Sequence, residues 1–298
     1  MKRLLLLIGL VYTAISCEKN IDLELPGGEP IPVLNALLQT GDSVVSATVN
    51  ISVPYRLTSG PTYVKDAVLR LYENDVLLGF FSICEENPFF ITTEEDTQYV
   101  FCLPAYVKEG STYRIEADVP GYPTVSGETT APGPPDVQDL QFNTTLQTLN
   151  FTFRDNYPGT NYYECELWAI DTTNEGFIGQ VEFTCRDYSF ELLGSGTDFI
   201  NLPVDDPLGL YLFTTDEYFS EGQKRVSITP QNETTATLFY QLIVSHGSPE
   251  YYEYRRTRIL NTFNGNSPFS EPVRIYSNVS SGLGIVAAFN MEIFIVEF

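Results

Sequence analysis

Residues 45–53 read VSATVNISV, and this stretch decides the expected fold. Its apolar side chains alternate strictly with Ser, Thr and Asn, which is the period of a β-strand that buries one face. Similar short runs, bounded by turn residues, predict further strands at 67–72, 76–84, 98–103, 112–119 and 124–129. This many short strands in about a hundred residues predict a β-sandwich.

The stretch Ala131–Pro135 reads APGPP and is the clearest boundary in the chain. Proline cannot donate to a strand ladder, so we predict a β-sandwich domain over 33–131 and a second domain over 136–298. The second domain is expected to be β-rich, with strands at 149–153, 162–170, 180–190, 225–228, 236–244, 274–276, 285–289 and 291–295. One short helix is predicted after Ser248, its N-cap, and it is expected to end at Gly265. The fold class is therefore mainly β.

Composition narrows the function before any motif is considered. The 298 residues are 43% hydrophobic, and 39 Asp and Glu stand against 16 Lys and Arg. A surface this acidic repels phosphate backbones, so nucleic acid is excluded as a partner. His246 is the single histidine, and no nucleophile motif, phosphate loop or metal-ligand set is found, so no enzyme and no cofactor are predicted. A carboxylate pair or a Ser–His arrangement is the remaining enzymatic alternative.

The N-terminus has the order of a bacterial lipoprotein signal. A basic start, an apolar stretch over 4–15 and Ser16 precede Cys17, which predicts a signal peptide over 1–16 and acylation of Cys17. Ala14 stands where Leu is usual in this pattern. The alternative is an ordinary secretory signal that leaves Cys17 as a disulfide partner. Residues 17–32 are acidic and rich in Pro and Gly, as expected of a tether.

Removal of Cys17 from the count leaves an even number of cysteines. They fall in two close pairs, Cys84 with Cys102 and Cys165 with Cys185. Disulfides within these pairs are predicted, since an exported protein folds in an oxidising compartment. Two other connectivities, or four buried free thiols, remain as alternatives.

Two segments resemble a known family. Cys17–Pro26 and Pro268–Ile285 are similar to the Bacteroidota outer-membrane lipoproteins catalogued as domain of unknown function 4249. The first half also resembles the immunoglobulin-like sandwiches of the transthyretin-like or carboxypeptidase-regulatory type, through 65–71, 110–115 and 120–122. The resemblance implies a lipid anchor in the outer membrane, exposure at the cell surface and a TonB-dependent β-barrel as partner. It implies no catalytic residues.

The expected function follows from the barrel partner that the family resemblance implies. We expect a non-enzymatic accessory or substrate-capturing subunit of a TonB-dependent-type barrel. The alternative is a free-standing surface lipoprotein or adhesin that binds glycan or protein. Both need a β scaffold with variable loops, so the sequence does not separate them.

Two groups of residues are candidates for partner binding. The first is the loop 278–284 with its glycines, for which a tight structural turn is the alternative. The second is a set of aromatic residues for which core packing is the alternative. These candidates are Asn278, Gly282, Gly284, Tyr211, Phe213, Tyr218 and Phe219.

Three acidic clusters are candidate Ca²⁺ sites, because oxygen-rich loops bind hard cations. None has the spacing of a recognised calcium loop, so solvated surface is the preferred interpretation and no metal is predicted. The clusters are Glu85–Glu86, Glu94–Asp96 and Asp205–Asp206.

Overall fold

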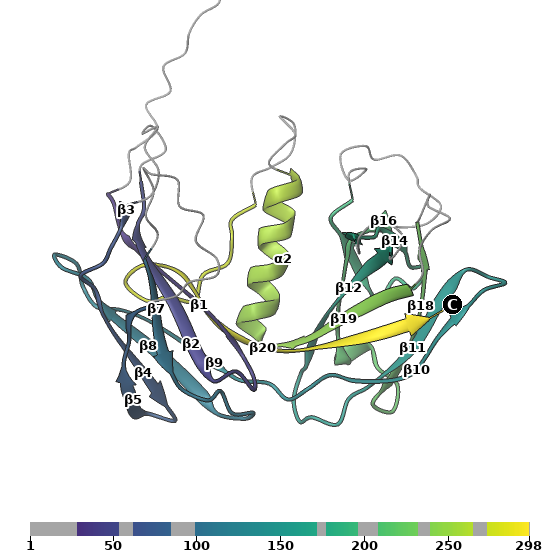
Figure 1. Ribbon diagram of the computed structural model, residues 1–298, viewed down its shortest axis with the longest axis horizontal. Coiled ribbons are helices and arrows are strands. Elements are labelled where there is room, and N and C mark those ends of the chain that lie inside the picture. The colour runs from purple at the N-terminus through teal and green to yellow at the C-terminus, as the bar shows by residue number, and fades with distance from the viewer. Residues whose placement is uncertain are drawn as a thin grey trace, which may run out of the picture.

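A computed structural model describes residues 29–53, 62–84, 99–171, 177–195, 208–231, 239–264 and 273–297. Two β-rich halves lie on either side of the helix α2 (Figure 1). The strands form an eleven-stranded, a five-stranded and a four-stranded sheet. The predicted fold class, mainly β with a sandwich arrangement and a helix in the second half, is confirmed.

The N-terminal half is a sandwich of two sheets. Its four-stranded sheet has the order β5-β4-β8-β9, and β1, β2, β3, β6 and β7 belong to the large sheet. The quoted stretch forms β2, whose Val45, Ala47 and Val49 are buried as the alternation predicts. The bounds are β1 Pro32–Gln39, β2 Val44–Ile51, β3 Thr62–Tyr63, β4 Val68–Glu73, β5 Val76–Phe80, β6 Ser82–Ile83, β7 Val100–Pro104, β8 Thr112–Asp118 and β9 Val125–Thr130.

The single strand predicted over 76–84 is in fact two strands. β5 lies at the edge of the four-stranded sheet, whereas β6 pairs with β7 in the large sheet. Phe81, between them, donates its backbone N–H to the carbonyl of Leu69 at 3.0 Å as the chain crosses over. Apolar residues continue through the crossing, which is why the sequence pattern hides it.

The C-terminal half is also a sandwich. Its five-stranded sheet, β10-β11-β18-β14-β16, packs against the part of the large sheet that holds β15, β17, β12 and β19. Phe151, Phe153, Tyr163 and Phe183 are among the buried side chains of its core. The bounds are β10 Asp136–Asn143, β11 Thr148–Arg154, β12 Tyr162–Asp171, β13 Phe177–Gln180, β14 Phe183–Thr184, β15 Glu191–Leu193, β16 Leu208–Gly209, β17 Tyr211–Thr215, the 3₁₀ turn η1 Asp216–Tyr218, β18 Gln223–Pro230 and β19 Phe239–Gly247.

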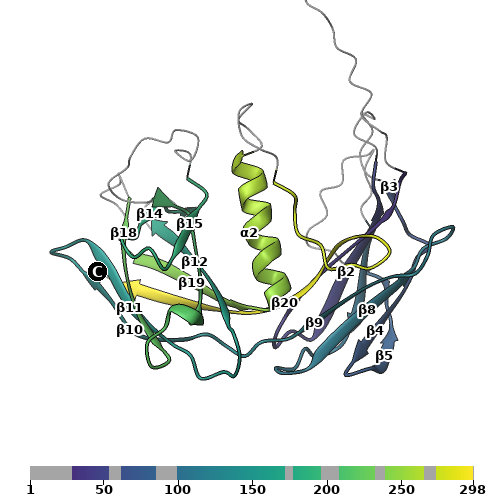
Figure 2. The ribbon, with the colours of Figure 1, turned by 180° about the vertical axis from the view of Figure 1, so that it is seen from behind.

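The last strand, β20 (Leu283–Glu297), belongs to both halves. Its first part runs parallel to β1, from the pair Val33–Leu283 to the pair Gln39–Phe289. Its second part is antiparallel to β19, and Figures 1 and 2 show it running beneath α2 from one half to the other. Val286 and Ala288 are buried in the core of the N-terminal sandwich. The sandwich predicted for 33–131 therefore also contains residues from the end of the chain.

The helix α2 (Pro249–Asn264) begins where the sequence predicts. The Ser248 hydroxyl accepts a hydrogen bond from the backbone N–H of Tyr251 at 3.2 Å, which satisfies one free donor of the first turn. Arg255 and Arg256 bind carboxylates of the sheet and hold the helix against it. Among the described residues, no helix has the length and hydropathy needed to cross a membrane. The predicted end at Gly265 lies outside the described residues.

The cysteines follow the prediction in one pair and contradict it in the other. Cys84 and Cys102 form a disulfide that joins the end of β6 to β7. Cys165 and Cys185 are free and buried, so the second predicted disulfide is wrong. Both lie in the aromatic core of the C-terminal half, where burial raises the pKa of each thiol and keeps it protonated. They pack there as small apolar side chains.

Candidate functional site

The candidate site is built on the outer face of the five-stranded sheet. Along β18, Val226 and Ile228 are buried in the core, so Arg225, Ser227 and Thr229 point to the opposite face. On the neighbouring strand β11, Asn150 lies across from Ser227 and Thr152 across from Arg225. Strand alternation thus places one polar row beside another.

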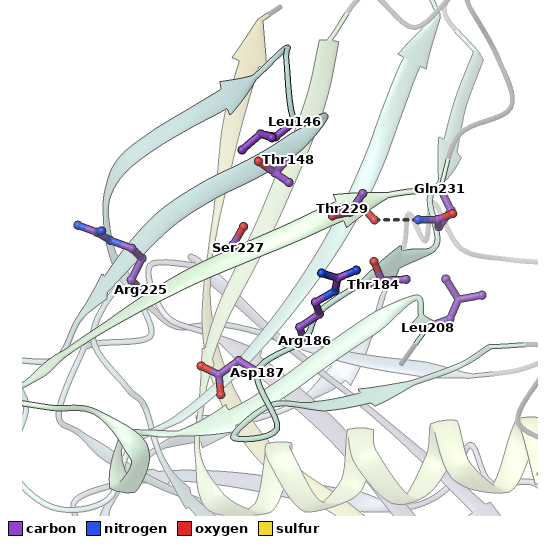
Figure 3. A pocket seen from close by; sticks show the side chains of 10 residues that line it. All are labelled: Leu146, Thr148, Thr184, Arg186, Asp187, Leu208, Arg225, Ser227, Thr229 and Gln231. Atoms are coloured by element: carbon purple, nitrogen blue, oxygen red, sulfur yellow. Dashed lines mark hydrogen bonds between the residues drawn. The ribbon is translucent and has the colours of Figure 1, made fainter. Parts of the chain in front are cut away.

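A groove of about 1080 Å³ lies over this face (Figure 3). Its lining combines hydroxyl and amide groups with two apolar side chains, Leu146 and Leu208, and Leu146 is 67% exposed. Figure 3 shows Arg186 beside Thr184 and Arg225 at the far end of the groove. The lining residues are Leu146, Thr148, Thr184, Arg186, Asp187, Leu208, Arg225, Ser227, Thr229 and Gln231.

Charges in the groove are unevenly balanced. Asp187 is the one carboxylate among the described lining residues, and Lys224 Nζ lies 2.8 Å from its Oδ2. Burial alone would raise the pKa of Asp187, but the hydrogen bonds from Lys224 and Ser189 outweigh it and hold this pKa below its usual value. The carboxylate is therefore ionised and already matched by a cation. This leaves Arg225 to set the sign of the charge at its end of the groove.

Arg225 is the most available cation of the groove. It is exposed, and it forms no ion pair with any residue in the described part of the chain. A second hollow of about 450 Å³, whose lining includes Asp139, Asn150 and Thr152, also borders Arg225. Its guanidinium therefore stands between two recesses on the same face.

His246 is part of a separate, buried cluster. Its Nδ1 lies 2.9 Å from the carbonyl oxygen of Gly133, and its Nε2 lies 3.1 Å from Asn161 Oδ1. The rings of Tyr157 and Tyr163 pack on the imidazole. Burial lowers the pKa of His246 to about 4. Both ring nitrogens are engaged inside the protein, where they tie the segment after β9 to the second half.

The predicted partner loop 278–284 packs against its own chain. The side-chain amide of Asn278 donates to the carbonyls of Glu128 and Val286 and accepts from the Val286 N–H. It therefore makes the hydrogen bonds that the backbone of a neighbouring strand would make. A Cβ on Gly282 would lie 2.6 Å from the Pro32 carbonyl oxygen. Gly284 is even more confined, with φ +113 and no room for a Cβ beside Leu34. Internal contacts account for these three residues.

The predicted aromatic candidates separate by burial. Phe213 is fully buried, and Phe219 stacks on Phe153 and Tyr163. Tyr211 is half-buried, with its hydroxyl 3.4 Å from Gln180 Oε1. Tyr218 is 57% exposed and is the member of this set that a partner can reach.

Several predicted features lie outside the described residues. These are the signal peptide 1–16, Cys17, the tether up to residue 28 and the clusters Glu85–Glu86, Glu94–Asp96 and Asp205–Asp206. Within the described ranges, no group of three or more His, Cys, Asp or Glu side chains is placed to hold a metal ion.

Sequence reasoning identified the strand at 225–228 but missed the groove. The signal was present in RVSIT over 225–229, where the apolar residues alternate with Arg, Ser and Thr. Alternation shows that one face is polar but does not show which strands lie beside it. The recess needs β11, β14 and β16 around β18, and these strands are distant in sequence.

Fold and groove together define a class: a β-sandwich protein of two halves with an open recess on one sheet, lined by both polar and apolar groups. The chain belongs to the family described as Domain of unknown function (DUF4249), which it matches over residues 18–292. A comparison with curated proteins gave no match. Among solved structures, the chain is similar to collagen adhesin from S. aureus at 7% identity, over 90% of this chain and 95% of that one. The TM-score is 0.16, which does not indicate a shared fold.

Proposed function

We propose that this protein is a non-enzymatic outer-membrane lipoprotein that captures a ligand for a TonB-dependent-type β-barrel. In this proposal, acylated Cys17 anchors it in the membrane and the folded part is exposed at the cell surface. The observation that carries the proposal is the open groove on the five-stranded sheet, whose lining includes hydroxyl, amide and guanidinium groups beside apolar surface. Such a recess offers many hydrogen-bonding groups to a ligand and leaves room for it to enter and depart.

The chemistry of the groove favours binding over turnover. Hydrolysis of a glycosidic bond by paired carboxylates needs two acids about 5 to 10 Å apart. Asp187 is the one acid among the described lining residues, and its charge is matched by Lys224. Turnover of a surface polysaccharide or peptide, lost when one Asp or Glu is replaced, would contradict this part of the proposal.

The anchor supports cooperation with a barrel. A lipid anchor confines the protein to two dimensions and raises its effective concentration near other membrane proteins. Mass spectrometry of the N-terminal peptide tests this step. We expect a mature chain that begins with an acylated Cys17, and an unmodified Cys17 or a chain that still begins at Met1 would overturn it.

The barrel partner is tested by isolation from the native membrane. The tagged lipoprotein is extracted in mild detergent at native expression and its partners are identified by mass spectrometry. We expect a β-barrel protein in stoichiometric amount. Tyr218→Ala removes an exposed aromatic side chain and should lower the recovery of the barrel. Tyr188→Ala, which removes a side chain that is 89% exposed at another turn, is the matched control and should leave the recovery unchanged.

The second candidate is a free-standing surface binding protein or adhesin. It is favoured by the openness of the groove, because a ligand can bind to a recess on the sheet face without passing on to a barrel. Recovery of the lipoprotein alone, with ligand binding intact, would support this candidate over the barrel accessory.

A further inference from the structure

We propose that the groove binds an acidic polysaccharide, with Arg225 as the residue that selects carboxylate or sulfate groups on the sugar. This inference rests on the proposed function, in which the groove is the ligand site, and it names the class of ligand. Three features carry it: the charge at the groove, the polar rows around that charge, and the position of the groove on a sheet face.

The positive charge beside the groove contrasts with the net charge of the protein. The chain has a formal net charge of −23, and several arginines, such as Arg70, Arg255 and Arg256, bind carboxylates. Arg225 lines one end of the recess and forms no ion pair with any described residue. A guanidinium remains charged at any physiological pH and offers a planar fork that matches carboxylate and sulfate oxygens. The open position beside Arg225 is thus suited to an anionic group.

The rows of polar side chains suit the rest of a sugar chain. From Arg225, Ser227 and Thr229 follow at every second residue of β18, a spacing of about 6.6 Å per step along a strand. Thr148 and Thr184 continue the polar surface on the neighbouring strands. Hydroxyl side chains both donate and accept hydrogen bonds, as sugar hydroxyls do. A linear polysaccharide can therefore follow the groove away from the charged end.

The position on a sheet face favours a ligand that is recognised by side chains. Peptides that bind to sheets add a strand at an exposed edge and use main-chain hydrogen bonds. β18 pairs with β11 along residues 223–228 and with β14 at Thr229 and Pro230. A ligand that lies over the face, rather than along the part of β18 without β14, is recognised by Arg225, Ser227 and Thr229, and binding of polyglutamate tests the peptide alternative.

The overall negative charge does not prevent the interaction. At physiological ionic strength the Debye length is about 8 Å, so exposed charges farther away are largely screened. Asp187, the acid among the described lining residues of the groove, is matched by Lys224, and Asp139 lines the smaller hollow beside Arg225 rather than the groove. On the groove side, Arg225 is therefore the cation that an anionic ligand meets.

The experiment uses pairs of polymers that differ in charge alone. Binding of the full acylated protein in detergent micelles is measured by titration calorimetry with polygalacturonate and with its methyl ester. Dextran sulfate and dextran form the second pair. We expect at least one acidic polymer to bind at least tenfold more tightly than its neutral counterpart. Preference within the first pair identifies carboxylate groups, and preference within the second identifies sulfate groups.

Variants connect the preference to the residue. Arg225→Gln should weaken binding of the acidic polymer at least tenfold, while thermal unfolding stays unchanged because the side chain is exposed. Arg258→Gln is the matched control, because Arg258 is exposed on α2 and its replacement removes the same charge elsewhere. Equal weakening by both variants would show a nonspecific charge effect and overturn the assignment.

The remaining outcomes are also decisive. Equal binding of acidic and neutral polymers, or binding of neither, overturns this inference. Binding of polyglutamate as tightly as the acidic polysaccharide, with the same dependence on Arg225, overturns the sugar assignment. Because the barrel partner is tested by isolation from the membrane, the proposed function can survive each of these results.

Discussion

Gly284 lies where β1 and β20 begin to run side by side, and its conformation is available to few other residues. Its φ is +113, and a Cβ at this position would lie 2.0 Å from the carbonyl oxygen of Leu34. Both the backbone angle and the space thus require glycine. The close approach allows the Leu34–Gly284 pair to form within the parallel ladder.

We expect Gly284→Ala to lower the free energy of unfolding by roughly 3 kcal/mol, from backbone strain plus overpacking. Urea denaturation measures the change. Gly41→Ala is the control, since Gly41 has φ +93 but a Cβ there would meet nothing within 4 Å. Its cost should be about 1 kcal/mol, from strain alone. Equal costs would show that the contact with Leu34 does not matter.

Arg255 has a buried partner, and this makes its ion pair different from that of Arg256. The Glu164 side chain is 3% exposed and Arg255 Nη2 lies 2.8 Å from Glu166 Oε1, whereas the Glu191 carboxylate that binds Arg256 is 37% exposed. Arg255→Met should cost about 3–5 kcal/mol at pH 7, because it leaves a buried charge without a partner. Arg256→Met should cost about 1 kcal/mol or less.

The pH dependence of Arg255→Met gives a second readout. Burial and the neighbouring Glu164 already raise the pKa of Glu166, and removal of the guanidinium raises it further. A carboxyl whose folded pKa is raised stabilises the fold at low pH and loses that contribution as pH rises through the folded pKa. The deficit of Arg255→Met should therefore shrink between pH 7 and pH 5. A deficit that does not change with pH would contradict the buried-charge explanation.

At the scale of elements, the sequence pattern correctly predicted features that depend on a few consecutive residues. The alternation in 45–53 and the Ser248 cap each depend on a few consecutive residues, and both have the expected structure. The strand predicted over 76–84 is wrong, because the change of sheet at Phe81 depends on which strand pairs with each end. The groove was missed for the same reason. Pairing between distant strands is not encoded in the period of any one of them.

The disulfide Cys84–Cys102 links two elements at the edge of the large sheet. A bond that closes a loop of this size should contribute about 3 kcal/mol. Reduction of this disulfide should therefore lower the urea concentration at the midpoint of unfolding. Replacement of both Cys165 and Cys185 by Ala should leave the disulfide in place. Thiol labelling of the chain without Cys17 provides the count: two reactive thiols after unfolding and four after unfolding with reductant. Four thiols without reductant would contradict the disulfide.

At the scale of the whole molecule, β20 makes the two halves depend on each other. The N-terminal core includes Val279, Val286 and Ala288, and the rest of β20 pairs with β19. A fragment that ends at residue 131 lacks these residues and exposes an edge of β1. We expect residues 29–131 alone to show weak dispersion of amide NMR signals and a broad thermal transition.

Two further measurements sharpen this expectation. Addition of a peptide covering 279–289 should restore dispersed signals, because it supplies the missing strand and the buried side chains. The same peptide with Gly284→Ala is the matched control and should fail. A cooperative transition of the fragment alone would show that the N-terminal sandwich is complete without the end of the chain.

The pairing of β1 with β20 also sets the order of events after synthesis. These strands lie near opposite ends of the folded chain, and contacts so distant in sequence form slowly. A ribosome makes the N-terminal half first, yet that half lacks its parallel neighbour until residues 283–289 emerge. We therefore expect nascent chains to stay incompletely folded until β20 has been made. In the proposed function the chain is exported, and this delay would then favour export, because a chain without finished tertiary structure remains able to pass through a narrow translocation channel.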